Sequence, residues 1–331
     1  GVRASPTAML NYDDATGFLI GQENCGLEYM FIMMNAARFA VGVQGIAISE
    51  RAYQRALAYA RDRVQSRPVN GQSKDAVPII DHPDVRRMLM RMRSLTESGR
   101  AMAAGTAGLL DIAHHQDHPE MARLAEFMVP LIKGFCTERA VEVASLGVQI
   151  HGGMGFIEEA GAAQHYRDAR ILPIYEGTTA IQANDLLGRK VMRDEGATAR
   201  LFAARIAETD ANLARGDASA QAISKKLAQA RGAFEAALDW ILENSRRDID
   251  AVFAGSVPFL MLAGTLAAGW KLAESALAAQ TALDVGQDTK FMTQKIATAL
   301  FYAEHILPEC VTEQTRIMHG SRSLLDAAFP E

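Results

Sequence analysis

The sequence predicts a mainly α-helical protein, in which a helical bundle follows a short β segment and a second helical unit follows the bundle. Apolar residues recur three and four positions apart from Met30 to about Arg63, which is the spacing of an amphipathic helix. A β-like run with several glycines is confined to the opening, and alanine-rich segments dominate beyond Gly196. Helical patterns therefore cover most of the chain.

Residues 1 to 26 are expected to be the end of a truncated β-domain. The stretch GVRASPTAML has the pattern of a strand, and the glycines after it indicate a loop. The chain begins with Gly1 instead of Met, and no charged segment followed by an apolar run marks a targeting peptide. We expect this strand to continue from a domain that precedes the sequence.

Residues 27 to 192 are expected to form a four-helix domain. After the first helix, two prolines and a glycine in SRPVNGQSKDAVPII predict a loop, and Asp81 is placed to cap the next helix. HGGMGF ends the third helix, a polar connector continues to Gly177, and a helix restarts near Ile181. The two helices between these loops are predicted at 83 to 115 and 119 to 150.

Residues 193 to 331 are expected to form an extra helical domain of three or four helices. One stretch in it, 251 to 270, is long enough to cross a membrane, but its small residues and Pro258 favour a buried helix. We therefore expect no membrane span. The alanine-rich segments that predict the helices run over 222 to 245, 257 to 281 and 289 to 318.

Composition excludes several function classes. The chain has 331 residues, of which 49% are hydrophobic and 22% charged, as in a globular protein. Its net charge of −5 argues against nucleic-acid binding. Cys25, Cys136 and Cys310 are odd in number and far apart, which suits a reducing compartment such as the bacterial cytoplasm, with the mitochondrial matrix as the weaker choice.

The histidine-rich stretch HHQDH, residues 114 to 118, has the residue types of a metal cluster. It falls at a polar turn between two predicted helices and has no convergent fourth ligand. We interpret it as a surface turn and expect no metal.

Glu176, in ILPIYEGTTAIQ, is a candidate general base. It is predicted to lie on a loop among Ile171, Leu172, Ile174 and Tyr175, where loss of hydration would raise its pKa toward neutral. The alternative is that its carboxylate only caps the helix that follows.

The motifs around Glu176 resemble those of the acyl-CoA dehydrogenase family. QIHGGMGF is followed by YEGTTAIQ, with Glu176 27 positions after Gln149 and YRDARILPI between them. NAARFAVGVQGIAISERAYQRALAYARDR resembles the first helix of the family's C-terminal domain, and the resemblance covers about residues 1 to 192. It implies FAD-dependent α,β-dehydrogenation of an acyl-CoA, with Glu176 removing the α-proton and the β-hydrogen leaving as hydride to flavin N5.

The resemblance also implies cofactor contacts. Arg63 corresponds to an arginine that contacts the FAD pyrophosphate, and Gln149, Gly152 and Gly153 correspond to a turn near its adenosine half. In the family these residues reach the FAD of the neighbouring subunit, whereas Thr178 touches the FAD of its own subunit. A homodimer or a dimer of dimers is therefore implied.

Substrate contacts follow in the same way. Asn35 and Arg38 correspond to positions along the CoA passage, although Arg38 could instead form an internal salt bridge. Tyr175 and Gly177 flank the base and are also expected to bind the substrate. A branch of the family carries its base beside the counterpart of Arg38, but here that neighbour is Ala37, so Glu176 stands alone.

The helices after residue 192 indicate a subgroup of the family, and two alternative functions stay open. The region after residue 192 resembles the extension of a bacterial subgroup that includes the 3-methylmercaptopropionyl-CoA dehydrogenases, and an electron-transfer flavoprotein or a similar acceptor is the implied partner. A DNA-binding, alkylation-response branch also has an extension, but 13 basic and 16 acidic residues from position 196 onward disfavour DNA. A further alternative is that these 331 residues by themselves form only a helical dimerisation module. We expect this module to be colourless, without bound flavin, and inactive on acyl-CoA.

Overall fold

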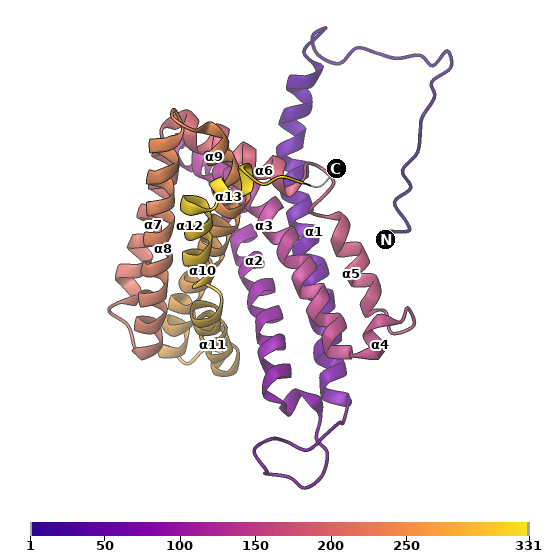
Figure 1. The fold of residues 1–331 in the computed structure, drawn as a ribbon, viewed down its shortest axis with the longest axis vertical. Coiled ribbons are helices and arrows are strands. Elements are labelled where there is room, and N and C mark those ends of the chain that lie inside the picture. Colours follow the sequence, from indigo (N-terminus) through magenta and orange to yellow (C-terminus); the bar gives the residue numbers. More distant parts are fainter. Residues whose placement is uncertain (1, 330–331) are drawn as a thin grey trace.

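Three long helices form the centre of the protein. The computed structural model describes residues 2 to 329, with the backbone only at Ile32, so the ends expected at residues 1 and 331 lie outside the described residues. Figure 1 shows α1, α2 and α3 running along the long axis, with α5 returning beside α1 and α3. Their bounds are Gly26–Asp62 for α1, Pro83–His115 for α2, Pro119–His151 for α3 and Ala162–Ile171 for α5.

The opening segment differs from the expected strand. Between residues 2 and 25 the described backbone forms turns and extended stretches but no strand, and it projects from the top of α1 in Figure 1. A strand needs a partner for its backbone N–H and C=O groups, and no described residue pairs with this segment as a ladder. The fold class is otherwise confirmed as mainly α.

Helix α3 is the core element, and glycines of α1 allow its close approach. A Cβ at Gly42 would lie 2.4 Å from the Ile132 side chain and 2.6 Å from the Ile132 carbonyl oxygen. Because only glycine lacks this atom, the backbones of α1 and α3 can approach at this point. Nearly the whole middle of α3 is buried as a result, from Phe127 to Thr137.

Prolines start two of the long helices. Pro83 and Pro119 begin α2 and α3, where a missing N–H costs nothing. The N-cap of α2 is His82 without a side-chain cap, so the cap predicted at Asp81 is wrong. Asp81 instead ends the short 3-10 helix η1, Ile79–Asp81.

The second helical unit packs beside the bundle and is built around α10. Figure 1 shows α7 and α8 on its outer side and α10, α11 and α12 toward the bundle. Helices α1 and α10 are each long and apolar enough to span a membrane. In α10, 78% of the most apolar stretch is buried within the protein. The elements are α7 Ala197–Leu213, α8 Ala218–Asn244, α9 Ile249–Ala254, α10 Ser256–Asp284, α11 Thr289–His305, α12 Glu309–His319 and α13 Ser321–Leu325.

Three expectations for the helices need correction. The described part of the second unit contains seven helices, α7 to α13, instead of three or four, because short helices such as α9 and α13 separate the long ones. The segment expected as one helix from 289 to 318 is two, because the chain turns at Leu307 and Pro308 and a proline cannot continue the hydrogen-bond ladder. The connector before Gly177 also contains α5, whose charged sequence AAQHYRDARI hid its helical character.

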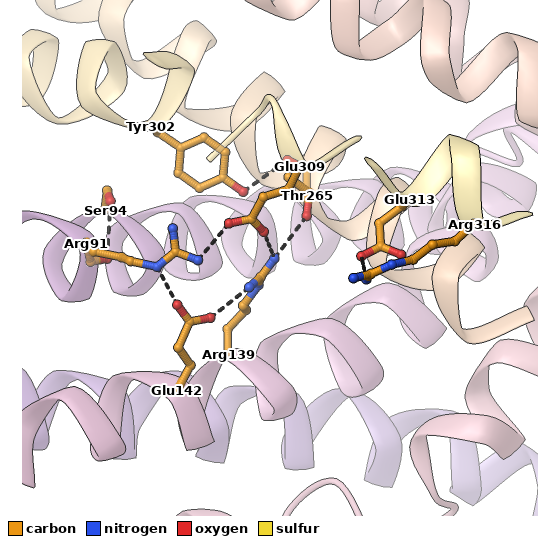
Figure 2. A network of polar contacts seen from close by, with 9 residues as sticks. All are labelled: Arg91, Ser94, Arg139, Glu142, Thr265, Tyr302, Glu309, Glu313 and Arg316. Carbon is orange, nitrogen blue, oxygen red and sulfur yellow. Dashed lines mark hydrogen bonds and ion pairs between the residues drawn. The ribbon is translucent and has the colours of Figure 1, made fainter. Parts of the chain in front are cut away.

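A ring of four charged side chains joins the second unit to the bundle (Figure 2). We call Arg91 of α2, Arg139 and Glu142 of α3, and Glu309 of α12 the ion-pair ring. Glu142 accepts hydrogen bonds from both arginines. Glu309 accepts one hydrogen bond from Arg91 at 2.7 Å and one from Arg139 at 2.5 Å. Each carboxylate therefore bridges both guanidinium groups.

Candidate active site

The candidate base lies on the turn between α5 and α6, which we call the base turn, residues 172 to 178. Helix α6 runs Thr179–Asp185, followed by a π-helical turn, Leu186–Val191, and a 3-10 turn, Met192–Asp194. Thr178 is the N-cap of α6, and its hydroxyl accepts a hydrogen bond from the Ile181 N–H at 3.3 Å. The hydroxyl that the resemblance assigns to FAD thus also starts a helix.

The backbone of the base turn is left-handed at two consecutive residues. Glu176 has a φ of 55° and Gly177 a φ of 92°. The positive φ favours glycine at position 177, and a Cβ there would lie 2.6 Å from the Nε2 atom of Gln182 and would have to displace the end of that side chain. Glu176 adopts a conformation that is unfavourable for a residue with a side chain.

Glu176 is exposed, which corrects the expectation that it loses hydration among apolar neighbours. Ile171 and Ile174 are also exposed, and Leu172 points into the core. Tyr175 is half-buried because its hydroxyl donates to the Gln44 side-chain oxygen of α1. Among the described residues no side chain hydrogen-bonds to the Glu176 carboxylate, so its oxygens are free toward the open side of the turn.

The underside of the base turn is held by Lys133, which sequence reasoning missed. Lys133 is fully buried in α3, and its Nζ donates to the carbonyl oxygens of Leu172 at 2.9 Å and Gly177 at 2.5 Å. Burial lowers the pKa of Lys133 to about 8; Arg38 acts in the same direction, and the carboxylates of Glu138 and Glu176 oppose it. The available signal was a single lysine within the apolar run FMVPLIKGF.

Arg38 lies near this cation, on α1. It is buried and pairs with Asp185 of α6 at 3.4 Å, while its Nε has no partner among the described residues. Arg38 therefore does form a salt bridge, as the alternative predicted, but the bridge joins α1 to α6 instead of lying within one helix. Asn35, almost one helical turn earlier, is exposed.

A second group of candidate residues lies at the other end of the bundle. Arg63, Gln149, Gly152 and Gly153 are all exposed, and a Cβ at either glycine would meet no atom within 4 Å. The ring of Tyr59 stacks on that of His151 with centroids 4.4 Å apart, so the ends of α1 and α3 lie together. Open space against exposed glycine backbone fits a phosphate-bearing ligand.

The two groups are well separated along α1. Gln44 contacts the base turn through Tyr175, and Asp62 ends the helix beside Arg63. At 1.5 Å rise per residue these positions are roughly 27 Å apart. The structure thus brings Asn35, Arg38, Tyr175, Glu176, Gly177 and Thr178 to one region, and the other four residues to another.

No metal centre forms in the described part of the chain. His114 and His115 contact each other edge to face at 4.8 Å, but no group of three or more histidine, cysteine, aspartate or glutamate side chains converges there.

Comparison with known families matches both helical parts of the chain. The profile described as "Acyl-CoA dehydrogenase, C-terminal domain" matches residues 24 to 192, and that described as "Acetyl-CoA dehydrogenase C-terminal like" matches residues 197 to 328. The chain belongs to the acyl-CoA dehydrogenase family.

Individual relatives confirm the resemblance and its subgroup. The chain is 65% identical to the 3-methylmercaptopropionyl-CoA dehydrogenase of Ruegeria pomeroyi, over 99% of this chain and 56% of that protein. It is 34% identical to the broad-specificity linear acyl-CoA dehydrogenase FadE5 of Mycobacterium tuberculosis, over 93% of this chain and 54% of that protein. The similarity includes the second helical unit.

A solved structure shares the fold. The acyl-CoA dehydrogenase of Bacillus anthracis complexed with FAD superposes with a TM-score of 0.69 at 22% identity, over 93% of this chain and 54% of that chain. The chain therefore spans about half the length of the proteins that it matches.

Proposed function

We propose that the chain supplies the general base and part of the FAD site of an FAD-dependent acyl-CoA dehydrogenase. In this reaction the α-carbon loses a proton, the β-carbon loses a hydride, and a double bond forms between them. The observation that carries the proposal is the free Glu176 carboxylate on a left-handed turn, within the residues that match the family. FAD, when bound, supplies the hydride acceptor.

The residues of the chain fit these roles. Glu176 has no internal partner, so its oxygens are available to take the α-proton of a thioester. Arg38, held by Asp185, leaves its Nε unpaired and adds a positive charge near the CoA passage. Tyr175 and Gly177 flank the base and would contact the acyl group.

The separation of the two residue groups supports a shared cofactor site. The two groups lie at Gln44, which Tyr175 of the base turn contacts, and at Asp62, which precedes Arg63; these two positions of α1 are roughly 27 Å apart, farther than a five-carbon ribityl chain reaches. We propose that Glu176 and Thr178 serve the FAD of their own subunit, while Arg63, Gln149, Gly152 and Gly153 serve that of a partner copy. A homodimer, alone or paired into a tetramer, is the smallest assembly that satisfies this.

The substrate is proposed from the strongest similarity described above. At 65% identity, 3-methylmercaptopropionyl-CoA is the first acyl-CoA to test. An electron-transfer flavoprotein or a similar acceptor would reoxidise the flavin. The three free cysteines suit a reducing bacterial cytoplasm.

Anaerobic flavin bleaching tests the proposal. The protein is expressed from its native gene and mixed with 3-methylmercaptopropionyl-CoA, butyryl-CoA or octanoyl-CoA in the absence of oxygen. We expect a yellow protein that bleaches within seconds with at least the first substrate and forms the α,β-unsaturated thioester. A colourless preparation, or a flavin that no acyl-CoA reduces, would instead support a helical dimerisation module.

A further inference from the structure

We infer that Lys133 is the positioning residue of the proposed base: it holds the base turn from beneath and so directs the Glu176 carboxylate outward. The inference rests on the proposed function of Glu176. It names a residue that no motif around the base contains, since Lys133 lies on α3, 43 positions before Glu176.

The two hydrogen bonds of Lys133 join the two ends of the turn. Its Nζ donates to the carbonyl of Leu172, where α5 ends, and to that of Gly177, directly after the base. Among the described residues these carbonyls have no other hydrogen-bond donor outside helical ladders. One buried ammonium therefore fixes the peptide groups that bracket Glu176.

The conformation of Glu176 explains why such a hold is needed. A left-handed backbone is unfavourable for a residue with a Cβ, so the turn relaxes unless its surroundings determine it. The neighbouring contacts come from Thr179, three residues after the base, which donates its hydroxyl to Glu138 at 2.5 Å and its N–H to the carbonyl oxygen of Pro173 at 3.0 Å. These contacts fix the start of α6, and Lys133 fixes the residue after the base.

Lys133 lies among several charged groups. Those that face it are Glu138 of its own helix, Arg38 of α1 and Glu176 of the turn, and Asp185 of α6 balances Arg38. The carboxylates of Glu138 and Glu176 favour the charged form of Lys133, which carries the donors for both hydrogen bonds.

Gln182 provides a matched control. It is as buried as Lys133 and lies against Gly177, but neither its amide nitrogen nor its amide oxygen has a partner among the described residues. Gln182→Met changes the packing beneath the turn without removing a hydrogen bond. Lys133→Met removes two hydrogen bonds and one charge at nearly constant volume.

The first measurement is amide hydrogen exchange in the purified protein before substrate is added. In Lys133→Met we expect the amides of Tyr175 and Thr179 to exchange about 10-fold faster or more, because the turn opens locally. Peptides from α8 should keep their protection in the same variant, and Gln182→Met should leave the turn protected. Unchanged protection of the turn in Lys133→Met would overturn the inference.

The second measurement is deuterium incorporation at the α-carbon of a bound acyl-CoA. In Lys133→Met we expect a rate about 100-fold lower from misplacement of the base, with flavin content and KM within about 2-fold. A general loss of structure would instead lower the flavin content and raise KM as well. Lys133→Arg, which keeps the charge and the donors, should recover most of the rate.

The outcomes separate the two proposals. If the unsubstituted protein exchanges no α-proton, the proposed function fails, while amide exchange still decides whether Lys133 holds the turn. If Lys133→Met does not fold, Lys133→Gln has a shorter side chain that cannot hold both carbonyl groups, and we expect the turn to exchange faster than in the unsubstituted protein. Full protection of the turn in Lys133→Gln would then contradict the inference.

Discussion

Helix α3 carries two clusters of charged residues that are built in opposite ways. Glu142 of the ion-pair ring lies nine positions after Lys133, which places the two on opposite faces of the helix. In the ring, both carboxylates bridge two arginines, as Figure 2 shows. At the base turn, the carboxylate of Glu176 has no partner among the described residues, and only the backbone beneath it is held.

The comparison shows that one helix can hold a charge cluster that stabilises the fold on one face and support the proposed base on the other. Burial opposes the charge of Arg91, but hydrogen bonds and attraction from Glu142 and Glu309 outweigh it and raise its pKa. Burial likewise opposes ionisation of Glu142, yet Arg139 and Arg91 bring its pKa below the ordinary value. A carboxylate held this firmly is not available to a substrate, whereas no described side chain holds the carboxylate of Glu176, as its proposed role requires.

Breaking the ring should have the largest effect on stability. Arg139→Met leaves Glu309 and Glu142 with one arginine between them, and we expect unfolding to become easier by about 3 to 5 kcal/mol. Urea denaturation measures this change. Arg200→Met removes an exposed pair with Asp239 and should cost less than about 1 kcal/mol. Equal losses in the two variants would show that the ring contributes no more than a surface pair.

Lys133 should produce a smaller, pH-dependent effect. Its pKa falls from 10.5 to about 8 on folding, so the penalty for burying its charge is present below pH 8 and disappears as the pH rises toward 10.5. Relative to Lys133→Met, the unsubstituted protein should gain roughly 3 kcal/mol over that range. Cys136 and Tyr302 titrate similarly in both proteins and cancel in the difference. Parallel stability curves from pH 8 to 10.5 would contradict this.

The thiols report whether the core around the ring stays closed. Burial raises the pKa of Cys136 to about 12 and that of Cys310, which follows Glu309, well above its ordinary value. At pH 8 a thiol reagent should therefore modify only the partly exposed Cys25 in the native protein, and all three cysteines after unfolding. Arg139→Met should make Cys310 reactive sooner. Rapid labelling of Cys136 in the native protein would argue for an open core.

Glu176 should matter least for stability. Because its carboxylate is exposed and unpartnered, Glu176→Gln should change the free energy of unfolding by less than about 0.5 kcal/mol. Thermal denaturation of the two proteins side by side measures this. A loss as large as that of Arg139→Met would mean that Glu176 is a structural residue.

The long helices could be predicted from local patterns, because their periodicity, prolines and glycines act within a few residues. Helix α2 begins and ends as predicted, at Pro83 and His115. The expected strand failed because strands depend on distant partners, and the split at Pro308 was hidden by alanine-rich flanks.

The sequence motif points to Glu176 as the candidate base, which stays a prediction, whereas the surroundings of Glu176 could not be predicted from the motif. Lys133 meets Gly177 only after α3 and the base turn pack together, and Arg91 meets Glu309 across 218 positions. The exposure of Glu176 was also missed, since apolar neighbours in sequence do not have to cover a side chain in space. Long-range contacts therefore carry the part of the site that the sequence left open.

Exchange at the substrate α-carbon tests the central claim most directly, because it isolates proton removal from hydride loss. The protein from its native gene is incubated with an acyl-CoA in deuterium oxide, and deuterium at the α-carbon is followed by mass spectrometry. The control is Glu195→Gln, since Glu195 is also exposed and left-handed, with a φ of 53°, but precedes α7. We predict that Glu176→Gln lowers the exchange rate by about 10² to 10⁴ at unchanged flavin content, whereas Glu195→Gln leaves it unchanged. Near-normal exchange in Glu176→Gln would contradict the assignment of the base.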